Sequence, residues 1–138
     1  MLATGSSNKG LSLQVIVDTS FLMLPGILGI DIIGEMDRLL GSYEILIPSP
    51  VIAELKRLSA QGKPKERAAA RLALALAKRG SVVNVEGEAD ESIVKLAAEK
   101  KCLVGTSDLT LRKKLRARGI NVIYLRGRSH LALNGQLG

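Results

Sequence analysis

Four acidic side chains that are far apart in the sequence have the type and placement expected of a site for metal-ion or acid–base chemistry. Asp18 directly follows the apolar run 15–17, and Asp108 comes two residues after the apolar segment 102–106. Each therefore emerges beyond the carboxyl end of a predicted strand, where parallel sheets bind their ligands. The alternative for both is a purely local role, because a carboxylate at the start of a helix accepts hydrogen bonds from free backbone N–H groups.

The other two acids, Glu54 and Asp90, lie on predicted helices. Glu54 is three residues after Val51, so it shares the apolar stripe of its helix and needs a polar partner there. Arg57, one turn later, is the simple alternative to a functional role for Glu54. Asp90 lies in the first turn of its helix, three residues before a core-facing isoleucine.

If the four carboxylates share one pocket, their charges repel by roughly 3–4 kcal/mol per pair at an effective dielectric constant near 20. Such a cluster either keeps protons with raised pKa values or binds a cation. A set of oxygen ligands without cysteine or histidine suits Mg²⁺ or Mn²⁺, ions that also recruit substrate phosphates. An acidic metal pocket beside basic surfaces is typical of phosphodiester hydrolysis.

The elements that would position these residues follow from the hydrophobic pattern. Short apolar strands alternate with helices, which predicts an α/β fold, a three-layer α/β/α sandwich around a five-stranded, mainly parallel sheet. The expected strands are 13–17, 44–48, 81–85, 102–106 and 120–125, and a break at Pro25 and Gly26 precedes the first helix. We expect one domain over residues 11–128, with tails at 1–10 and 129–138.

Composition narrows the classes of function. The chain has 138 residues and a net charge of +7, with lysine and arginine concentrated in 55–80 and 107–138, which favours a polyanionic partner such as nucleic acid. One cysteine and one histidine exclude a disulfide and a structural zinc site, and an aromatic content of 2% argues against binding by base stacking. No apolar run is long enough to span a membrane, so we expect a cytoplasmic protein. The candidate nucleic-acid-binding residues are Arg112, Lys113, Arg116, Arg126 and Arg128, whose alternative is a solvated surface.

Four segments resemble the acidic motifs of the PIN-domain nucleases in order and spacing: VIVDTSFLM, IPSPVIAELKRL, EADESIVKLA and CLVGTSDLTLRKKLRARGINVIYL. The resemblance covers about residues 14–126 and is most specific at the Asp-Thr-Ser and Thr-Ser-Asp triplets. It implies divalent-metal-dependent cleavage of RNA that leaves 5′-phosphate and 3′-hydroxyl ends. The acidic quartet falls on Asp18, Glu54, Asp90 and Asp108, and Thr106, with Ser20, would orient a water or an acid.

The sequence therefore predicts an endoribonuclease that uses Mg²⁺ or Mn²⁺. The last segment is most similar to archaeal PIN proteins related to the ribosomal RNA nucleases of the small-subunit processome, and toxin nucleases of the VapC type are similar too. A role in RNA processing, with a ribosome-assembly partner, and a toxin role, with an antitoxin partner, both stay open. So does a homodimer, for which the apolar segment 21–33 is a candidate contact. The alternative function is a non-catalytic RNA-binding or ribosome-assembly factor with the same fold.

Overall fold

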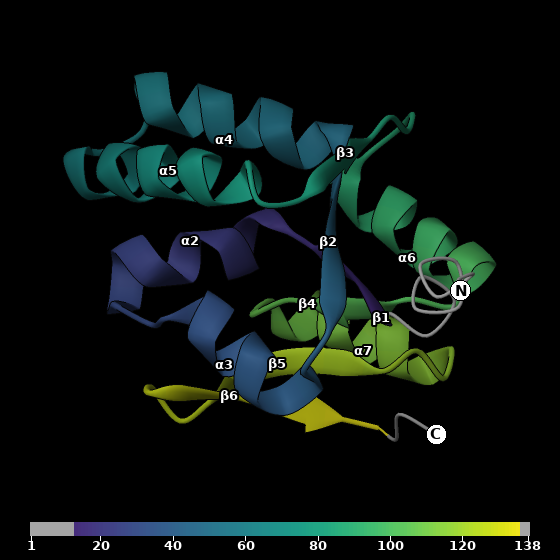
Figure 1. The fold of residues 1–138 in the computed structure, drawn as a ribbon. Coiled ribbons are helices and arrows are strands. Elements are labelled where there is room, and N and C mark those ends of the chain that lie inside the picture. Colours follow the sequence, from purple (N-terminus) through teal and green to yellow (C-terminus); the bar gives the residue numbers. More distant parts are fainter. Residues whose placement is uncertain (1–12, 136–138) are drawn as a thin grey trace, which may run out of the picture.

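A computed structural model describes residues 13–135 of the chain, in which a central sheet is surrounded by helices (Figure 1). The strands are β1 (Leu13–Val17), β2 (Tyr43–Pro48), β3 (Ser81–Val83), β4 (Leu103–Gly105), β5 (Val122–Arg126) and β6 (His130–Asn134). The helices are α2 (Thr19–Leu28), α3 (Ile32–Leu40), α4 (Ser49–Gln61), α5 (Pro64–Ala77), α6 (Ala89–Lys100) and α7 (Leu109–Ala117). The expected tail 1–10 lies outside the described residues.

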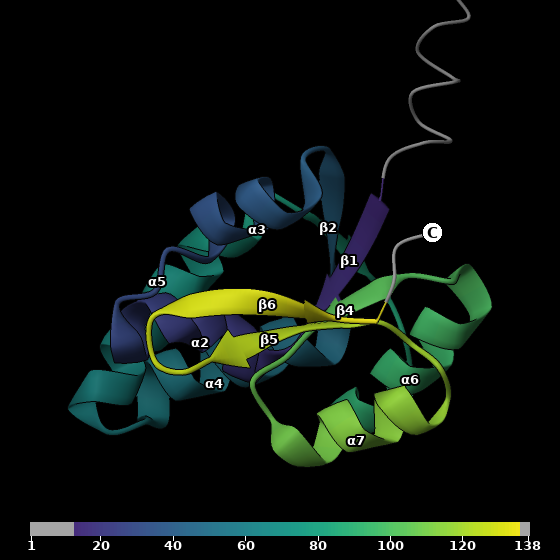
Figure 2. The ribbon, with the colours of Figure 1, turned by 90° about the horizontal axis from the view of Figure 1, so that it is seen from below.

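The sheet has the order β3-β2-β1-β4-β5-β6, and every pair of neighbouring strands is parallel except β5 and β6. The central strand β1 buries Val15, Ile16 and Val17 completely, as expected of a strand covered on both faces. Helices α6 and α7 lie on one side of the sheet, and α2 and α3 lie on the other (Figure 2). The predicted α/β fold with a mainly parallel sheet is therefore confirmed.

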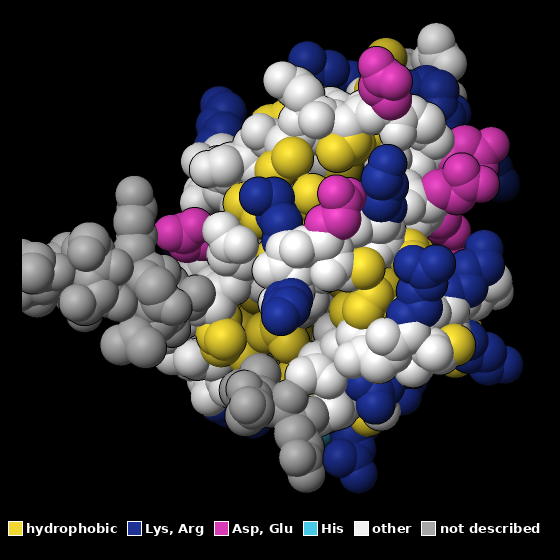
Figure 3. Space-filling view, turned by 90° about the vertical axis from the view of Figure 1, so that its right-hand side faces the viewer, with side chains coloured by type: hydrophobic (Ala, Val, Ile, Leu, Met, Phe, Trp, Pro, Cys, Tyr) yellow, Lys and Arg dark blue, Asp and Glu magenta, His cyan; other side chains and the backbone are white. Residues whose placement is uncertain are grey.

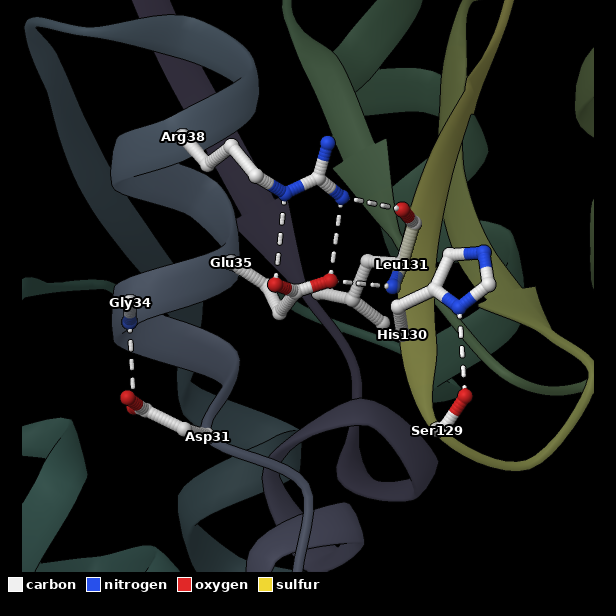
Figure 4. A network of polar contacts seen from close by, with 7 residues as sticks. All are labelled: Asp31, Gly34, Glu35, Arg38, Ser129, His130 and Leu131. Carbon is white, nitrogen blue, oxygen red and sulfur yellow. Dashed lines mark hydrogen bonds and ion pairs between the residues drawn. The ribbon is translucent and has the colours of Figure 1, made fainter.

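The sheet has a sixth strand in addition to the five that we expected, and this strand lies in the segment assigned to the C-terminal tail. Gly127, at a φ of 66°, turns the chain after β5, so that His130–Asn134 pairs antiparallel with it. Glu35 and Arg38 on α3 then hold the outer edge of β6 (Figure 4). The N–H of Leu131 donates to Glu35 at 2.8 Å, and the guanidinium of Arg38 donates to the Leu131 carbonyl at 3.0 Å. These bonds satisfy backbone groups that an edge strand would otherwise leave open.

Helix α2 runs through the point at which the sequence predicts a break. Pro25 lies inside the helix, where it removes one backbone donor but does not end the helix. Packing against α5 outweighs this cost, and Gly26 makes the packing possible: a Cβ atom there would lie 2.4 Å from the Ala69 Cα atom. The helix ends instead at Gly29, whose left-handed conformation closes it.

The apolar segment that we considered for a homodimer contact contributes mainly to the core of the monomer. Phe21, Leu22, Met23 and Leu24 are all buried within the domain. Within residues 13–135, no single helix is long and apolar enough to cross a membrane. Helices α2 and α3 together have the length and composition of a membrane span, but a bend of 120° separates them.

Candidate active site

Two of the predicted acids lie beyond the carboxyl ends of adjacent strands, β1 and β4. Asp18 follows β1 and is only 6% exposed, and its backbone N–H donates to the carbonyl of Gly105, the last residue of β4, at 3.2 Å. Gly105 also leaves room for the Phe21 ring of α2, because a Cβ atom at this position would lie 3.0 Å from that ring. The absence of a side chain in β4 thus lets α2 pack against the strand that leads to Asp108.

A network of hydroxyl groups links the two aspartates. Thr106, which is fully buried, donates from Oγ1 to Oδ2 of Asp18 and accepts a hydrogen bond from the N–H of Asp108 at 3.0 Å. Ser20 donates to Oδ1 of Asp18 at 2.8 Å and accepts from the N–H of Ser107 at 3.0 Å. These bonds fix the orientation of the Asp18 carboxylate and hold the loop after β4 against the start of α2.

Both aspartates also cap helices, as the local alternative predicted. Asp18 accepts a hydrogen bond from the N–H of Phe21 at 2.8 Å, and Asp108 accepts from the N–H groups of Thr110 at 2.8 Å and Leu111 at 3.2 Å. In both residues the helix N–H groups bond to Oδ1. A capping role therefore coexists with a position at the edge where parallel sheets bind ligands.

Glu54 projects from α4 toward the start of α2. Thr19 Oγ1 donates to Oε1 of Glu54 at 2.6 Å, while the Arg57 guanidinium lies 3.9 Å from Oε2. The contact with Arg57 is long and both side chains are substantially exposed, so the ion pair contributes little. Thr19 is the residue that fixes the Glu54 carboxylate. Its only sequence signal is a hydroxyl next to Asp18, and nothing in the sequence indicates a contact with a helix 35 residues away.

The four predicted acids line one cavity of about 580 Å³ at the carboxyl edge of the sheet. Figure 2 shows β5 running toward the end of the molecule where α2 lies and where α7 begins. Burial raises the pKa of Asp90, and the charges of Asp108 and Glu54 raise it further, so the carboxylates influence one another across this cavity. The fold thus brings together the four segments that carry these acids.

The arrangement is looser than a closed cage of carboxylates. Among residues 13–135, no three acidic, histidine or cysteine side chains lie close enough to hold one ion together. This geometry still fits Mg²⁺ or Mn²⁺, because Mg²⁺ keeps several waters and needs only one or two carboxylates besides phosphate oxygens of the substrate. The donor set, four carboxylates without nitrogen or sulfur, suits these hard cations.

The Asp18 carboxyl group is strongly influenced by its environment. Burial raises its pKa to about 6, against the lowering effect of the hydrogen bonds from Thr106, Phe21 and Ser20, and the charge of Asp108 raises it further. A buried carboxylate that lies near a second acid is stabilised when it binds either a proton or a cation. Perturbed carboxyl groups of this kind concentrate at functional sites.

The predicted cationic residues have different surroundings. The Arg112 guanidinium lies 3.6 Å from the centroid of the Tyr124 ring, a cation–π contact that holds it over this residue of β5. Arg116 donates to the Ile120 carbonyl at 3.0 Å and to Asn121 Oδ1 at 3.1 Å, so part of its donor capacity stabilises the end of α7. The other three predicted cations are exposed: Lys113, Arg126 and Arg128.

The face that carries α6 shows lysine and arginine side chains around exposed apolar groups (Figure 3). Lys95 on α6 and Lys114 on α7 line a groove there that also contains Asp90. Basic groups therefore border the acidic cavity on its α7 side, and the positive charge of Lys114 lowers the pKa of Asp90.

Comparison with known proteins places this geometry in a family. Residues 15–128 match the family model described as "PIN like domain". Ribonuclease VapC9 of Archaeoglobus fulgidus is 37% identical over 111 residues, which cover 80% of this chain and 82% of that protein. Ribonuclease VapC4 of Methanocaldococcus jannaschii is 34% identical over 129 residues, covering 90% of this chain and 98% of that protein.

Solved structures agree with this assignment. The structure of the PIN domain endonuclease Utp24 superposes with a TM-score of 0.72 at 26% identity, covering 89% of this chain and 92% of that chain. At the level of fold alone, VapBC2 from Rickettsia felis bound to a DNA fragment matches with a TM-score of 0.63 at 15% identity, covering 83% of this chain and 100% of that chain. The chain thus belongs to the PIN-like domain family, in agreement with its four acidic motifs.

Proposed function

We propose that this protein is a divalent-metal-dependent endoribonuclease that hydrolyses phosphodiester bonds of RNA. One observation carries the proposal: four carboxylates from four separate segments line the same cavity at the carboxyl edge of the sheet. The similarity to two VapC ribonucleases over most of both chains supports RNA as the substrate.

The cavity supplies the ligands that such chemistry needs. Asp18, Glu54, Asp90 and Asp108 would hold Mg²⁺ or Mn²⁺, directly or through water. When bound, such an ion activates a water for in-line attack and neutralises the charge that develops on the phosphate.

The surrounding residues orient this site and bind the substrate. Thr106 donates to the Asp18 carboxylate, and Thr19 donates to Glu54. The Asp108 carboxylate accepts from the backbone N–H groups at the start of α7, so three of the four carboxylates are oriented before substrate arrives. Arg112 and the exposed cations Lys113, Arg126 and Arg128 would bind phosphates of the RNA backbone without reading its sequence.

The direct test is a cleavage assay on structured and unstructured RNA. We expect internal cleavage in Mn²⁺ or Mg²⁺, with 5′-phosphate and 3′-hydroxyl products, and complete loss of cleavage after chelation with EDTA. Restoring Mn²⁺ restores cleavage. RNA binding without turnover, in saturating Mn²⁺ and with several RNAs, would instead identify the protein as a non-catalytic RNA-binding or ribosome-assembly factor.

Between the two biological roles, we assign the VapC-type role with an antitoxin partner ahead of ribosomal RNA processing. Both VapC ribonucleases exceed 30% identity, whereas the Utp24 endonuclease structure is 26% identical. Expression of the wild-type chain is expected to arrest growth of a host cell, and co-expression of the protein encoded next to it to restore growth. Active ribonuclease without any effect on growth would favour RNA processing.

A further inference from the structure

The cavity that holds the four acids has a second, apolar end. Its wall is formed by the aliphatic side chains of one helix and one strand: Met23, Leu24, Ile27 and Leu28 from α2, and Leu125 from β5. Ile27, Leu28 and Leu125 are only partly buried in the domain, so they present apolar surface to the cavity. None of these wall residues is among those to which we assign metal binding or the orientation of an acid.

The acidic end and the apolar wall lie within reach of a single RNA strand. Asp18 caps α2, and the four wall residues of this helix follow by five, six, nine and ten positions. At a rise of 1.5 Å per residue, the wall covers a stretch about 8 to 15 Å along the helix axis from the cap. Leu125 closes it from β5, and the next residue, Arg126, is exposed.

We propose that this aliphatic wall binds the unstacked base of a nucleotide next to the scissile phosphate. The inference rests on the proposed ribonuclease activity. A ribose-phosphate backbone is charged and polar and gains nothing from aliphatic surface, whereas the face of a base gains by leaving water. A base inside a duplex is stacked and paired, so it reaches a wall of this kind only when it is turned out of the helix.

The chemistry of the wall limits what it selects. None of the described residues that line the cavity is aromatic, and the wall itself offers no side-chain donor or acceptor to the edge of a base. The wall therefore distinguishes a nucleotide that has a base from one that has none, but it does not read a sequence. An apolar side chain of a protein partner is the competing occupant. Continuity of the wall with the acidic end favours RNA, because the molecule whose phosphate enters at the acids also passes the wall.

Abasic substrates test the proposal with the wild-type protein. A fluorescein-labelled, single-stranded RNA oligonucleotide of mixed sequence is first cleaved in Mn²⁺ to map one preferred site. Copies that carry a single abasic ribose at each position around this site are then compared. We expect one position, next to the scissile phosphate, at which loss of the base lowers kcat/KM by about tenfold, whereas abasic riboses further away have no effect.

A variant of the wall then tests whether Ile27 contacts that base. Ile27→Ser should lower kcat/KM for the intact RNA. In this variant, removal of the base should lower kcat/KM by less than about twofold, because the contact between base and wall is already missing. Leu72→Ser, which changes a 43% exposed leucine on α5, is the matched control and should retain the full penalty. If Ile27→Ser is unstable, the abasic series with the wild-type protein still decides.

The outcomes separate this proposal from the ribonuclease proposal. Equal cleavage of every abasic copy, or a full penalty retained in a folded Ile27→Ser variant, overturns the base site and leaves the wall as a contact for a protein chain. Failure of the wild-type protein to cleave any RNA in Mn²⁺ overturns the ribonuclease activity itself.

Discussion

Asp18→Asn is expected to slow RNA cleavage by at least about 100-fold while leaving the fold intact. The substitution removes the charge of a carboxylate that lies between the hydroxyls of Ser20 and Thr106 and lines the acidic cavity. Its remaining carbonyl oxygen can still accept the capping bond from Phe21, so α2 keeps its start. Loss of charge stabilisation at a developing transition state lowers kcat by roughly 100- to 1,000-fold, which a cleavage assay in Mn²⁺ measures directly.

The control for this experiment is Glu91→Gln, purified in the same way. Glu91 is exposed on α6 next to Asp90 but does not line the acidic cavity, so its neutralisation should leave the rate unchanged. Circular dichroism and thermal unfolding establish that both variants are folded. An Asp18→Asn protein that cleaves RNA as fast as the wild type would contradict the role assigned to the carboxylate cavity.

The sheet could be predicted largely from sequence because its strands are short apolar runs. Val15–Val17 reads as a strand covered on both faces and is one in the structure. Helix α2 could not be predicted, since local propensity at Pro25 argues for a break, while packing of Gly26 against α5 depends on residues more than 40 positions away. The sixth strand is missed for a similar reason: its edge is held by Glu35 and Arg38 on a distant helix.

The positions of the acids could likewise be predicted from the sequence, but their contacts could not. That Asp18 and Asp108 would emerge at one edge of the sheet follows from the apolar runs before them and from the parallel arrangement of the strands. The contacts that orient the carboxylates are tertiary. The hydrogen bond between Thr19 and Glu54 joins two helices, and the guanidinium of Arg116 turns toward its own helix end rather than toward solvent. Sequence patterns specify which segment a side chain belongs to but not the partner that it reaches.

Because Asp18 is buried, ionisation of its carboxyl group lowers the stability of the folded protein, and this effect depends on pH. In the unfolded chain its carboxyl group has the ordinary pKa of 3.8, whereas burial raises the pKa to about 6 in the folded protein. The folded state therefore binds this proton more tightly, so stability is highest below pH 4 as far as this group is concerned. As the pH rises from about 3 to about 7, the Asp18 carboxyl group loses its proton at lower pH in the unfolded chain than in the folded protein, and the free energy of unfolding falls by up to about 3 kcal/mol.

Asp18→Asn removes this titration, so in EDTA the variant is expected to be more stable than the wild type above pH 6. The difference in free energy of unfolding should be small near pH 4, grow as the pH passes 6 and become constant above about pH 7. Urea denaturation at a series of pH values measures it. Added Mn²⁺ should stabilise the wild type at pH 7.5 and leave the variant nearly unchanged, because cation binding compensates the buried charge that the variant lacks. A difference that does not change with pH in EDTA would mean that the Asp18 carboxyl group titrates normally, and that its charge is already balanced without a cation.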